Sequence, residues 1–423
     1  MKVLLVNYYY HPMVDAHAYR WTQLSEHWAE KGFQVDVICS KVGNVEDSEC
    51  GKNIQVTRVG FFRAIKMQAK KSIGSENVSS RKEMVATLKQ NLRLVYRKFY
   101  WPDGLWHWFF SVSAELFKRR ATKYDLIVSY SPTFTAHLAV MLFKKMVTSS
   151  SYWIADYGDP FSTSISMPNN NISLYGALNR WAESLVLSRA SKVCFTSQST
   201  VDDYFSVFGA MDNAHLIPHM ANVEKIYDEI SEISDPAVIR LVFIGNFHVG
   251  IREPFWASDV IERLAGFLHL KNDQPIVFDI YGASNGVDVA SICSPIINWH
   301  GPLDRERVNE VIGGADFLVN IENTNCSMIP SKIVEYIATG KPIIDIAQKN
   351  KDVSRLLNLY AAEGGAIIID ENFSNEFVDL KRFIERYKGN GKISIDTINS
   401  ILSDFGIEDV SRRYLENIEG APR

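Results

Sequence analysis

A lysine and a glutamate three residues apart, at the start of a predicted helix, are the residues with the clearest chemical task in this sequence. Ser331 is suited to cap the helix, and Gly340 and Pro342 supply its end. Lys332 then lies in the first turn, where the helix dipole and the unpaired backbone amides favour an anion. The cation is therefore unfavourable there on its own, but it would become favourable if a phosphate were bound beside it. Glu335 is the second member of the pair.

Glu335 lies about one turn beyond Lys332 on the same face, so its carboxylate can accept hydrogen bonds from a ribose diol. Together with the amides of the helix, the pair predicts a site for a nucleotide-sugar diphosphate. The alternative is an ordinary surface helix on which the two residues form a weak i, i+3 ion pair, since short motifs often match by chance. Spacing alone leaves both interpretations open.

The segment around this pair carries three short motifs in order: Pro330-Ser331-Lys332, Glu335-Tyr336 and Gly340-Lys341-Pro342. Their order resembles the nucleotide-sugar helix of GT-B glycosyltransferases, in particular the retaining family-4 group that builds bacterial surface polysaccharides. Other segments extend the resemblance over nearly the whole chain. It implies an α/β protein with two Rossmann-like domains facing a central cleft and a C-terminal helix that crosses back to the first domain.

Length and composition agree with this expectation. A chain of 423 residues is too long for one ordinary core and suggests two or three domains. The net charge of -4 gives no sign of general nucleic-acid binding. Five scattered cysteines without C-x-x-C spacing argue against a disulfide framework or a zinc site and fit a cytoplasmic protein. No stretch reaches the ~18 apolar residues of a membrane span, and the N-terminus lacks a signal sequence.

Buried strands followed by a polar loop and a helix open both halves of the chain. Residues 3–6 form the first such strand, and residues 240–244 form its counterpart in the second half. In α/β sheets of this kind, ligands bind at the carboxyl ends of the strands. The expected parts are residues 1–220, an acceptor-binding domain; residues 221–400, a nucleotide-sugar-binding domain; and residues 401–423, the returning helix.

The loop after the first strand provides candidates for acceptor contacts. In the resembled family this loop carries glycines before an arginine, and Arg20 matches that arginine while residues 15–17 replace the glycines. His11 and His17 could contact an acceptor, although loop histidines are more often plain surface residues. These three residues, together with Asp156, form the expected acceptor-binding set.

A later strand ends in Asp156-Tyr157-Gly158-Asp159-Pro160-Phe161, where an α/β sheet places its chemistry. This segment resembles the family motif Asp-aromatic-Arg-Asp-Pro-aromatic, with Gly158 where arginine is usual. Asp159 is the best candidate for a contact with the acceptor hydroxyl or for a weak base, and Asp156 is the second. A strand-end turn that uses Asp and Pro for backbone reasons is the alternative.

The donor side follows from the second half of the chain. Arg252 matches the family's basic residue that binds the donor diphosphate, and a guanidinium can hold two phosphate oxygens at once. Trp299 and His300 would flank the nucleobase, although both could equally belong to the core. Ser327 replaces the first glutamate of the family's Glu-x7-Glu pattern, so the donor sugar is not implied. The expected catalytic residues are Arg252, Lys332 and Asp159; the expected donor-binding residues are Gly245, Asn246, Trp299, His300, Pro330, Ser331 and Glu335.

A basic stretch, residues 63–98, carries ten cations against two acids, and an aromatic cluster follows it at residues 99–110. Cations and interfacial aromatics suit an anionic membrane surface. The alternative is that the aromatics fill the core of the first domain while the cations form a solvated helix face.

The resemblance therefore implies transfer of a sugar from a nucleotide diphosphate to a hydroxyl of a glycan or polyprenyl-linked acceptor, with retention at the anomeric carbon. No Asp-x-Asp clamp is evident, so we expect no metal, and we expect no cofactor. The expected location is the cytoplasm, at the inner face of the membrane. Alternatives are a nucleotide-sugar 2-epimerase, a phosphorylase, for which no lysine context for pyridoxal phosphate stands out, and a degenerate GT-B module acting as a partner subunit. The last would account for replacements at Gly158, His219, Met220 and Ser327.

Overall fold

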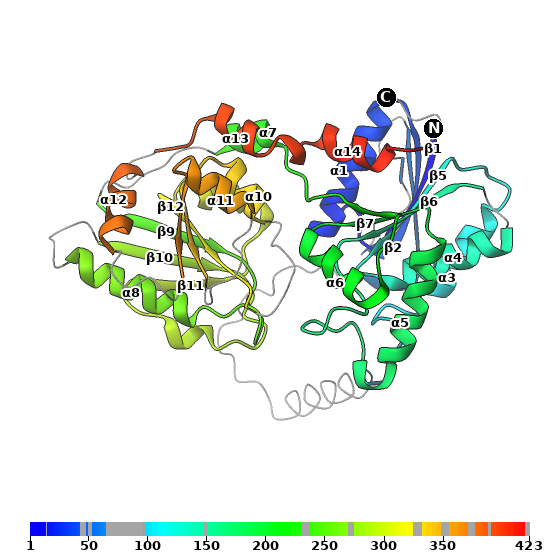
Figure 1. Cartoon of the computed structure of the whole chain (residues 1–423), viewed down its shortest axis with the longest axis horizontal. Coiled ribbons are helices and arrows are strands. Elements are labelled where there is room, and N and C mark those ends of the chain that lie inside the picture. Colours follow the sequence, from blue (N-terminus) through cyan, green and yellow to red (C-terminus); the bar gives the residue numbers. More distant parts are fainter. Residues whose placement is uncertain are drawn as a thin grey trace. The chain divides into compact units, whose positions relative to one another are not determined.

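The chain folds into two compact units (Figure 1). Met1–Pro218 and Val410–Arg423 form unit 1, and His219–Asp409 forms unit 2. The sequence placed the first boundary after residue 220 and the start of the C-terminal return at residue 401. The computed structural model describes residues 1–13, 15–42, 48–49, 53–64, 96, 98–147, 150–230, 237–269, 275–324, 332–347, 355–370, 377–387 and 391–418.

Unit 1 is built on a sheet with the strand order β3-β4-β2-β1-β5-β6-β7-β8, in which β3 alone is antiparallel to its neighbour. The strands are β1 (Lys2–Val6), β2 (Gln34–Val42), β3 (Ser48–Glu49), β4 (Ile54–Ala64), β5 (Leu126–Ser131), β6 (Tyr152–Tyr157), β7 (Lys192–Phe195) and β8 (Ala214–Leu216). The helices packed with them are α1 (Ala16–Glu30), α3 (Trp108–Lys118), α4 (Phe134–Val147), α5 (Ile172–Arg189) and α6 (Gln198–Phe208).

The central strands of this sheet are continuous apolar runs because they are buried on both faces. Leu4, Leu5 and Val6 of β1 have no exposed surface. The neighbouring helix α1 begins at Asp15, whose carboxylate accepts from the backbone N–H of His17 at 2.8 Å. This cap fixes the position at which the first loop turns into the helix.

Unit 2 contains a second, fully parallel sheet with the order β11-β10-β9-β12-β13-β14. Its strands are β9 (Ile239–Ile244), β10 (Ile276–Tyr281), β11 (Ile297–Gly301), β12 (Phe317–Ile321), β13 (Ile343–Ile346) and β14 (Ala366–Ile369). The helices are α7 (Val223–Glu229), α8 (Phe255–His269), α9 (Val308–Gly313), α10 (Lys332–Ala338), α11 (Arg355–Ala362), α12 (Phe377–Tyr387) and α13 (Ile395–Ile401), with 3-10 turns at Val289–Ile292, Arg305–Arg307 and Ser403–Phe405. The last helix, α14 (Ile407–Leu415), begins in unit 2 and belongs to unit 1 from Val410 on.

Each unit has its own hydrophobic core. Trp108 and Trp153 lie in the core of unit 1, and Leu241, Phe278 and Ile337 lie in that of unit 2. Two doubly wound sheets with separate cores confirm the expected α/β architecture of two Rossmann-like domains. None of the helices in the described ranges is both long and apolar enough to cross a membrane.

The C-terminal helix α14 returns to unit 1, as the sequence predicted. Val410 and Tyr414 of α14 have no exposed surface. The indole N–H of Trp28 in α1 donates to the Ser411 hydroxyl at 2.8 Å. At the end of the helix, the buried Lys192 ammonium donates to the Arg413 carbonyl, which satisfies one of the unpaired carbonyls there.

Candidate active site

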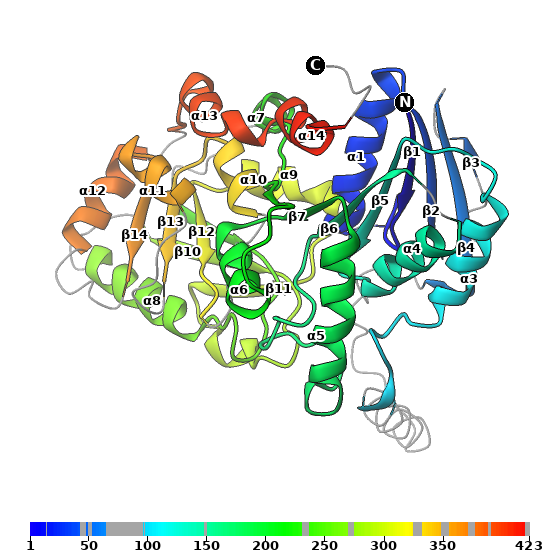
Figure 2. The same ribbon diagram turned by 45° about the vertical axis from the view of Figure 1, so that its right-hand side comes forward.

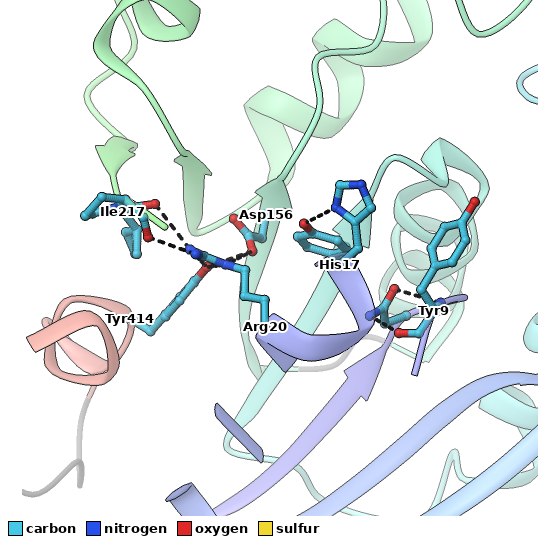
Figure 3. A network of polar contacts seen from close by, with 9 residues as sticks. Tyr9, His17, Arg20, Asp156, Ile217 and Tyr414 are labelled. Atoms are coloured by element: carbon cyan, nitrogen blue, oxygen red, sulfur yellow. Dashed lines mark hydrogen bonds and ion pairs between the residues drawn. The ribbon is translucent and has the colours of Figure 1, made fainter. Parts of the chain in front are cut away.

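A buried network in unit 1 ties Arg20 to the C-terminal helix (Figure 3). The guanidinium donates to the Pro218 carbonyl at 2.8 Å, to the Ile217 carbonyl at 3.2 Å and to the Tyr414 hydroxyl at 2.7 Å. Tyr414 in turn donates to the Asp156 carboxylate at 2.7 Å. The Arg20 Nε atom lies 3.9 Å from the same carboxylate.

This network is structural because neither charged group reaches solvent. Arg20 is 5% exposed and Asp156 has no exposed surface. Burial raises the pKa of Asp156 to about 6, against the opposing effects of Arg20 and the Tyr414 hydroxyl. The prediction that Arg20 and Asp156 contact the acceptor is therefore wrong for this structure. Their desolvated charges and hydrogen bonds instead hold the end of β6, the chain at Ile217 and α14 together.

Asp159, three residues further on, is the acid of this segment that reaches the surface. Its side chain is 39% exposed, and its Oδ2 atom lies 3.5 Å from Nε2 of His17, whose side chain is 23% exposed. Nδ1 of His17 lies 2.7 Å from the Tyr130 hydroxyl at the end of β5. Burial raises the pKa of Tyr130 well above its usual range, so the phenol stays protonated. When the phenol donates to Nδ1, the neutral imidazole carries its proton on Nε2 and directs it at Asp159.

Gly158 leaves room for the Tyr130 side chain, whose hydroxyl contacts His17 of α1. A Cβ atom at this position would lie 1.9 Å from the Tyr130 hydroxyl, so the space beside Asp159 has no room for a side chain from residue 158. The Tyr130 side chain occupies this space, and its hydroxyl is the hydrogen-bond partner of the His17 ring. Sequence reasoning singled out His17 and Asp159 but missed Tyr130, whose only signal was its place at the end of a buried strand.

His11 is also exposed but is placed differently. Its backbone carbonyl accepts from Arg58 at 2.9 Å, and its backbone N–H donates to the Thr22 hydroxyl at 3.4 Å. These contacts fix the first loop and leave the exposed imidazole at the surface of unit 1. No contact of the His11 ring with His17 or Asp159 is seen in the described residues.

In unit 2, two glycines allow β9 and β10 to meet at their carboxyl ends. The backbone N–H of Gly245 donates to the Tyr281 carbonyl at 2.7 Å. Gly282 has a φ of +146° and sits so close that a Cβ atom there would lie 1.8 Å from the Gly245 carbonyl. Asn246 is exposed and accepts from the backbone N–H of Ala283 at 3.0 Å. The close approach requires a residue without a side chain at position 282.

Helix α10 is anchored to the same edge. The Lys332 ammonium donates to the Ile244 carbonyl. Tyr336, one turn later, accepts from the Ile244 N–H at 2.9 Å. Burial raises the pKa of Tyr336. Glu335 lies half-buried on the same helix.

Lys332 is thus anchored at the end of β9, and Arg252 belongs to the loop that leaves this strand. The backbone of Arg252 forms a bridge with His248, in which each N–H donates to the other carbonyl, at 2.9 and 3.0 Å. Glu335 lies on α10, three residues after Lys332. Two cations from these neighbouring segments are of the kind that binds a diphosphate. The predicted site residues Pro330 and Ser331 lie outside the described residues.

Trp299 and His300 lie on the edge strand β11 and are both engaged by neighbours. The Trp299 indole donates to the Gly282 carbonyl at 3.0 Å, so it braces the β9–β10 corner. His300 stacks on Tyr281, with ring centroids 4.6 Å apart and an interplanar angle of 14°. Its Nε2 atom lies 2.8 Å from a carboxylate oxygen of Asp279. The stacked pair offers a planar surface near the glycine corner, which suits a nucleobase.

Comparisons with known proteins agree with the fold described above. The model of a family described as Glycosyltransferase Family 4 matches residues 18–225. Sucrose-phosphate synthase from Thermosynechococcus elongatus superposes with a TM-score of 0.61 at 13% identity, covering 98% of this chain and 97% of its own. Anabaena Alr3699/HepE in complex with UDP gives 0.59 at 11% identity, with complete coverage of both chains. WaaG, a glycosyltransferase of lipopolysaccharide biosynthesis, gives 0.52 at 13%, covering 99% and 100%. No curated protein sequence matches the chain.

Proposed function

We propose that the chain, which has the GT-B fold, is a glycosyltransferase that moves a sugar from a nucleotide-diphosphate sugar to a hydroxyl of a glycan or lipid-linked saccharide in surface polysaccharide synthesis. The observation that carries the proposal is the anchoring of Lys332 at the end of β9, the strand followed by the loop that carries Arg252. Structures of the similarly folded HepE contain UDP and UDP-glucose, which supports a uridine nucleotide as the first donor to test.

The donor site acts mainly on the leaving group. Negative charge grows on the diphosphate as the bond to the sugar breaks, and fixed cations stabilise it without reorganising at that moment. The bond to the Ile244 carbonyl holds the Lys332 ammonium at the end of β9, where its charge would stabilise the leaving diphosphate. The Arg252 guanidinium can hold two oxygens at once, and Glu335 is placed on α10 to accept from the ribose hydroxyls.

The acceptor side uses three residues: Tyr130 at the end of β5, Asp159 just after β6, and His17 in the first turn of α1. Asp159 receives the acceptor hydroxyl as a hydrogen-bond acceptor or weak base. His17 orients the carboxylate from one side, and Tyr130 fixes the tautomer of His17.

By resemblance we propose retention at the anomeric carbon, a place at the cytoplasmic face of the membrane, and no need for a divalent metal. Full activity in excess EDTA is the expected result; activity that is lost and then restored by magnesium or manganese contradicts the last point.

The experiment for the donor site is a melting-temperature panel of UDP-, GDP-, CMP- and dTDP-sugars on the purified protein. One class should raise the melting temperature, and Lys332→Met and Arg252→Met should each weaken its binding about tenfold or more. Lys225→Met and Arg263→Met are matched controls, because both are exposed cations elsewhere in unit 2. A panel in which no nucleotide sugar shifts the melt, or in which the controls weaken binding equally, contradicts the proposed site.

The structure gives no specific support to the alternatives. A degenerate module would be expected to leave Gly158 as an unfilled replacement, whereas the Tyr130 hydroxyl occupies that space and supports His17. A 2-epimerase needs no acceptor, so transfer to an added acceptor distinguishes it from the proposed enzyme.

A further inference from the structure

The long helix α5 in unit 1 exposes a row of large apolar side chains. Leu174, Leu178 and Trp181 are 55%, 38% and 60% exposed. Their spacing of four and then three residues places them on one face of the helix. The loop that leads into α5 adds Ile165 and Met167, which are 83% and 40% exposed. Figure 2 shows that the N-terminal half of α5 extends beyond the sheet of unit 1.

A second exposed apolar segment lies against this helix. The hydroxyl of Tyr175, in the first turn of α5, donates to the backbone carbonyl of Phe99 at 2.8 Å. Phe99 is 67% exposed, and further along its segment Trp106 and Phe110 are 37% and 56% exposed. The rings of Trp106 and Phe110 lie 6.2 Å apart, edge to face. The two segments together form the α5 face: Phe99, Trp106, Phe110, Ile165, Met167, Leu174, Leu178 and Trp181.

The exposed charge on these segments has one sign. Residues 98–110 and 160–189 contain only two acids, Asp103 and Glu183. Both acids are buried, at 4% and 0% exposure. The exposed cations in the two segments are Lys98, Arg180 and Arg189. Exposed cations on the same segments as exposed aromatic and aliphatic side chains are the composition of a surface that meets anionic lipid headgroups.

We propose that the α5 face binds an anionic lipid bilayer. Trp181 and the aromatic segment enter the headgroup region, and Lys98, Arg180 and Arg189 contact lipid phosphates. A second copy of this chain is the less suitable occupant, because two such positive faces would repel each other.

The same stretch of chain carries Asp159 and, a few residues later, Ile165. A bilayer on the α5 face would therefore present the saccharide of a lipid-linked acceptor near Asp159. This last step rests on the proposed function, whereas bilayer binding itself does not.

The test is cosedimentation of the full chain with vesicles of phosphatidylglycerol and phosphatidylcholine. The variant Leu174→Glu/Trp181→Glu places two acids on the α5 face at positions exposed enough to tolerate them. We expect its partition onto anionic vesicles to fall about tenfold or more, because an apolar contact is lost and repulsion is added. The control Leu359→Glu/Val378→Glu makes the same charge change at residues of unit 2 that are 41% and 47% exposed, and should bind like the wild type.

Vesicle binding that the α5 variant leaves unchanged would overturn the proposal. Equal binding of the wild type to pure phosphatidylcholine would also overturn it. A third contrary result would be a wild type that does not bind vesicles but forms a dimer in sedimentation velocity, which the α5 variant dissociates. The nucleotide-sugar melting shift is measured on the same samples. A wild type that binds vesicles without any nucleotide-sugar shift refutes the proposed function and leaves the bilayer site standing; the reverse result refutes only the bilayer site.

Discussion

Gly158 shows at the scale of single residues how one part of a site can be replaced from elsewhere in the chain. In the resembled family this position usually carries an arginine. Here the Tyr130 hydroxyl lies 1.9 Å from where a Cβ atom of residue 158 would be. The same hydroxyl forms a hydrogen bond with His17, which belongs to α1. The replacement involves residues far apart in sequence, so reading the motif alone finds only a missing side chain.

Tyr130→Phe should separate the acceptor side from the donor side. Without the hydroxyl, His17 loses the partner that fixes its tautomer, and Asp159 loses its oriented neighbour. We expect kcat/KM for the acceptor to fall about 10- to 100-fold while the nucleotide-sugar melting shift stays unchanged. Steady-state kinetics with varied acceptor measures the first quantity.

Tyr124→Phe is the control for this change. It also removes a buried phenol, one that donates to Asp36 at 2.7 Å, but just before the opposite, amino end of β5. Each substitution should cost about 1 to 3 kcal/mol of stability, because each leaves a buried partner less satisfied. Equal losses of acceptor kcat/KM in the two variants would mean that Tyr130 acts only through the fold.

Glu183 predicts a pH dependence of stability. Its buried carboxylate accepts from the Ser162 N–H at 3.0 Å and from the Tyr204 hydroxyl at 2.7 Å. Burial raises its pKa from the usual 4.5 to about 7, so between these values the folded protein holds a proton that the unfolded chain has released. Stability from this group is complete below pH 4.5 and is lost as pH rises to 7, by about 3 kcal/mol at most.

Glu183→Gln keeps a neutral group of the same shape and removes this titration. The free energy of unfolding of the variant, relative to wild type, should therefore increase from pH 4.5 to 7 and then level off. Urea denaturation at several pH values measures it. Glu310→Gln, a change at an exposed glutamate, serves as the control and should give a flat difference. A flat curve for Glu183→Gln would show that the buried carboxylate keeps an ordinary pKa.

At the scale of elements, the sequence predicted the strands and α10 well because their signals are local. Residues 3–6 and 240–244 were expected as buried strands and lie within β1 and β9. Helix α10 begins at Lys332, in the turn where the sequence placed it, and Gly340 follows its end with a φ of +73°. The contact of Lys332 with the Ile244 carbonyl could not be predicted, because it joins residues 88 apart.

Tyr414→Phe tests how α14 is held to unit 1. The hydroxyl accepts from Arg20 and donates to Asp156, so its loss leaves two buried charged groups each short of a hydrogen bond. We expect unfolding of unit 1 to become easier by about 2 to 3 kcal/mol, measured by urea denaturation. Ser411→Ala removes one neutral bond, from Trp28, on the same helix and should cost only about 1 kcal/mol. Equal small effects would mean that packing rather than the charged network holds α14.

At the scale of the whole molecule, the division into two Rossmann-like units was predictable because each half repeats the order of buried strand, polar loop and helix. The expected boundary after residue 220 compares with Pro218 in the structure, while the return to unit 1 begins at Val410, within α14, rather than at residue 401. The network that joins Arg20 to Tyr414 spans 394 positions of sequence. No local pattern encodes such a contact, and this is why Arg20 and Asp156 were assigned to the acceptor instead of to the fold.

Two separate cores predict two unfolding transitions, of which a nucleotide sugar should raise only one. The proposed donor contacts Lys332, Arg252 and Glu335 all belong to unit 2. A donor at a hundred times its dissociation constant stabilises the unit that binds it by about 2.7 kcal/mol, which raises its melting temperature by about 5 to 10 °C for a unit of this size.

Tyr414→Phe identifies the transition of unit 1, because it should lower that one alone. In calorimetry the donor should therefore move the transition that Tyr414→Phe leaves in place. A donor that moves only the transition lowered by Tyr414→Phe would place the nucleotide-sugar site in unit 1 and refute the assignment of Lys332 and Arg252.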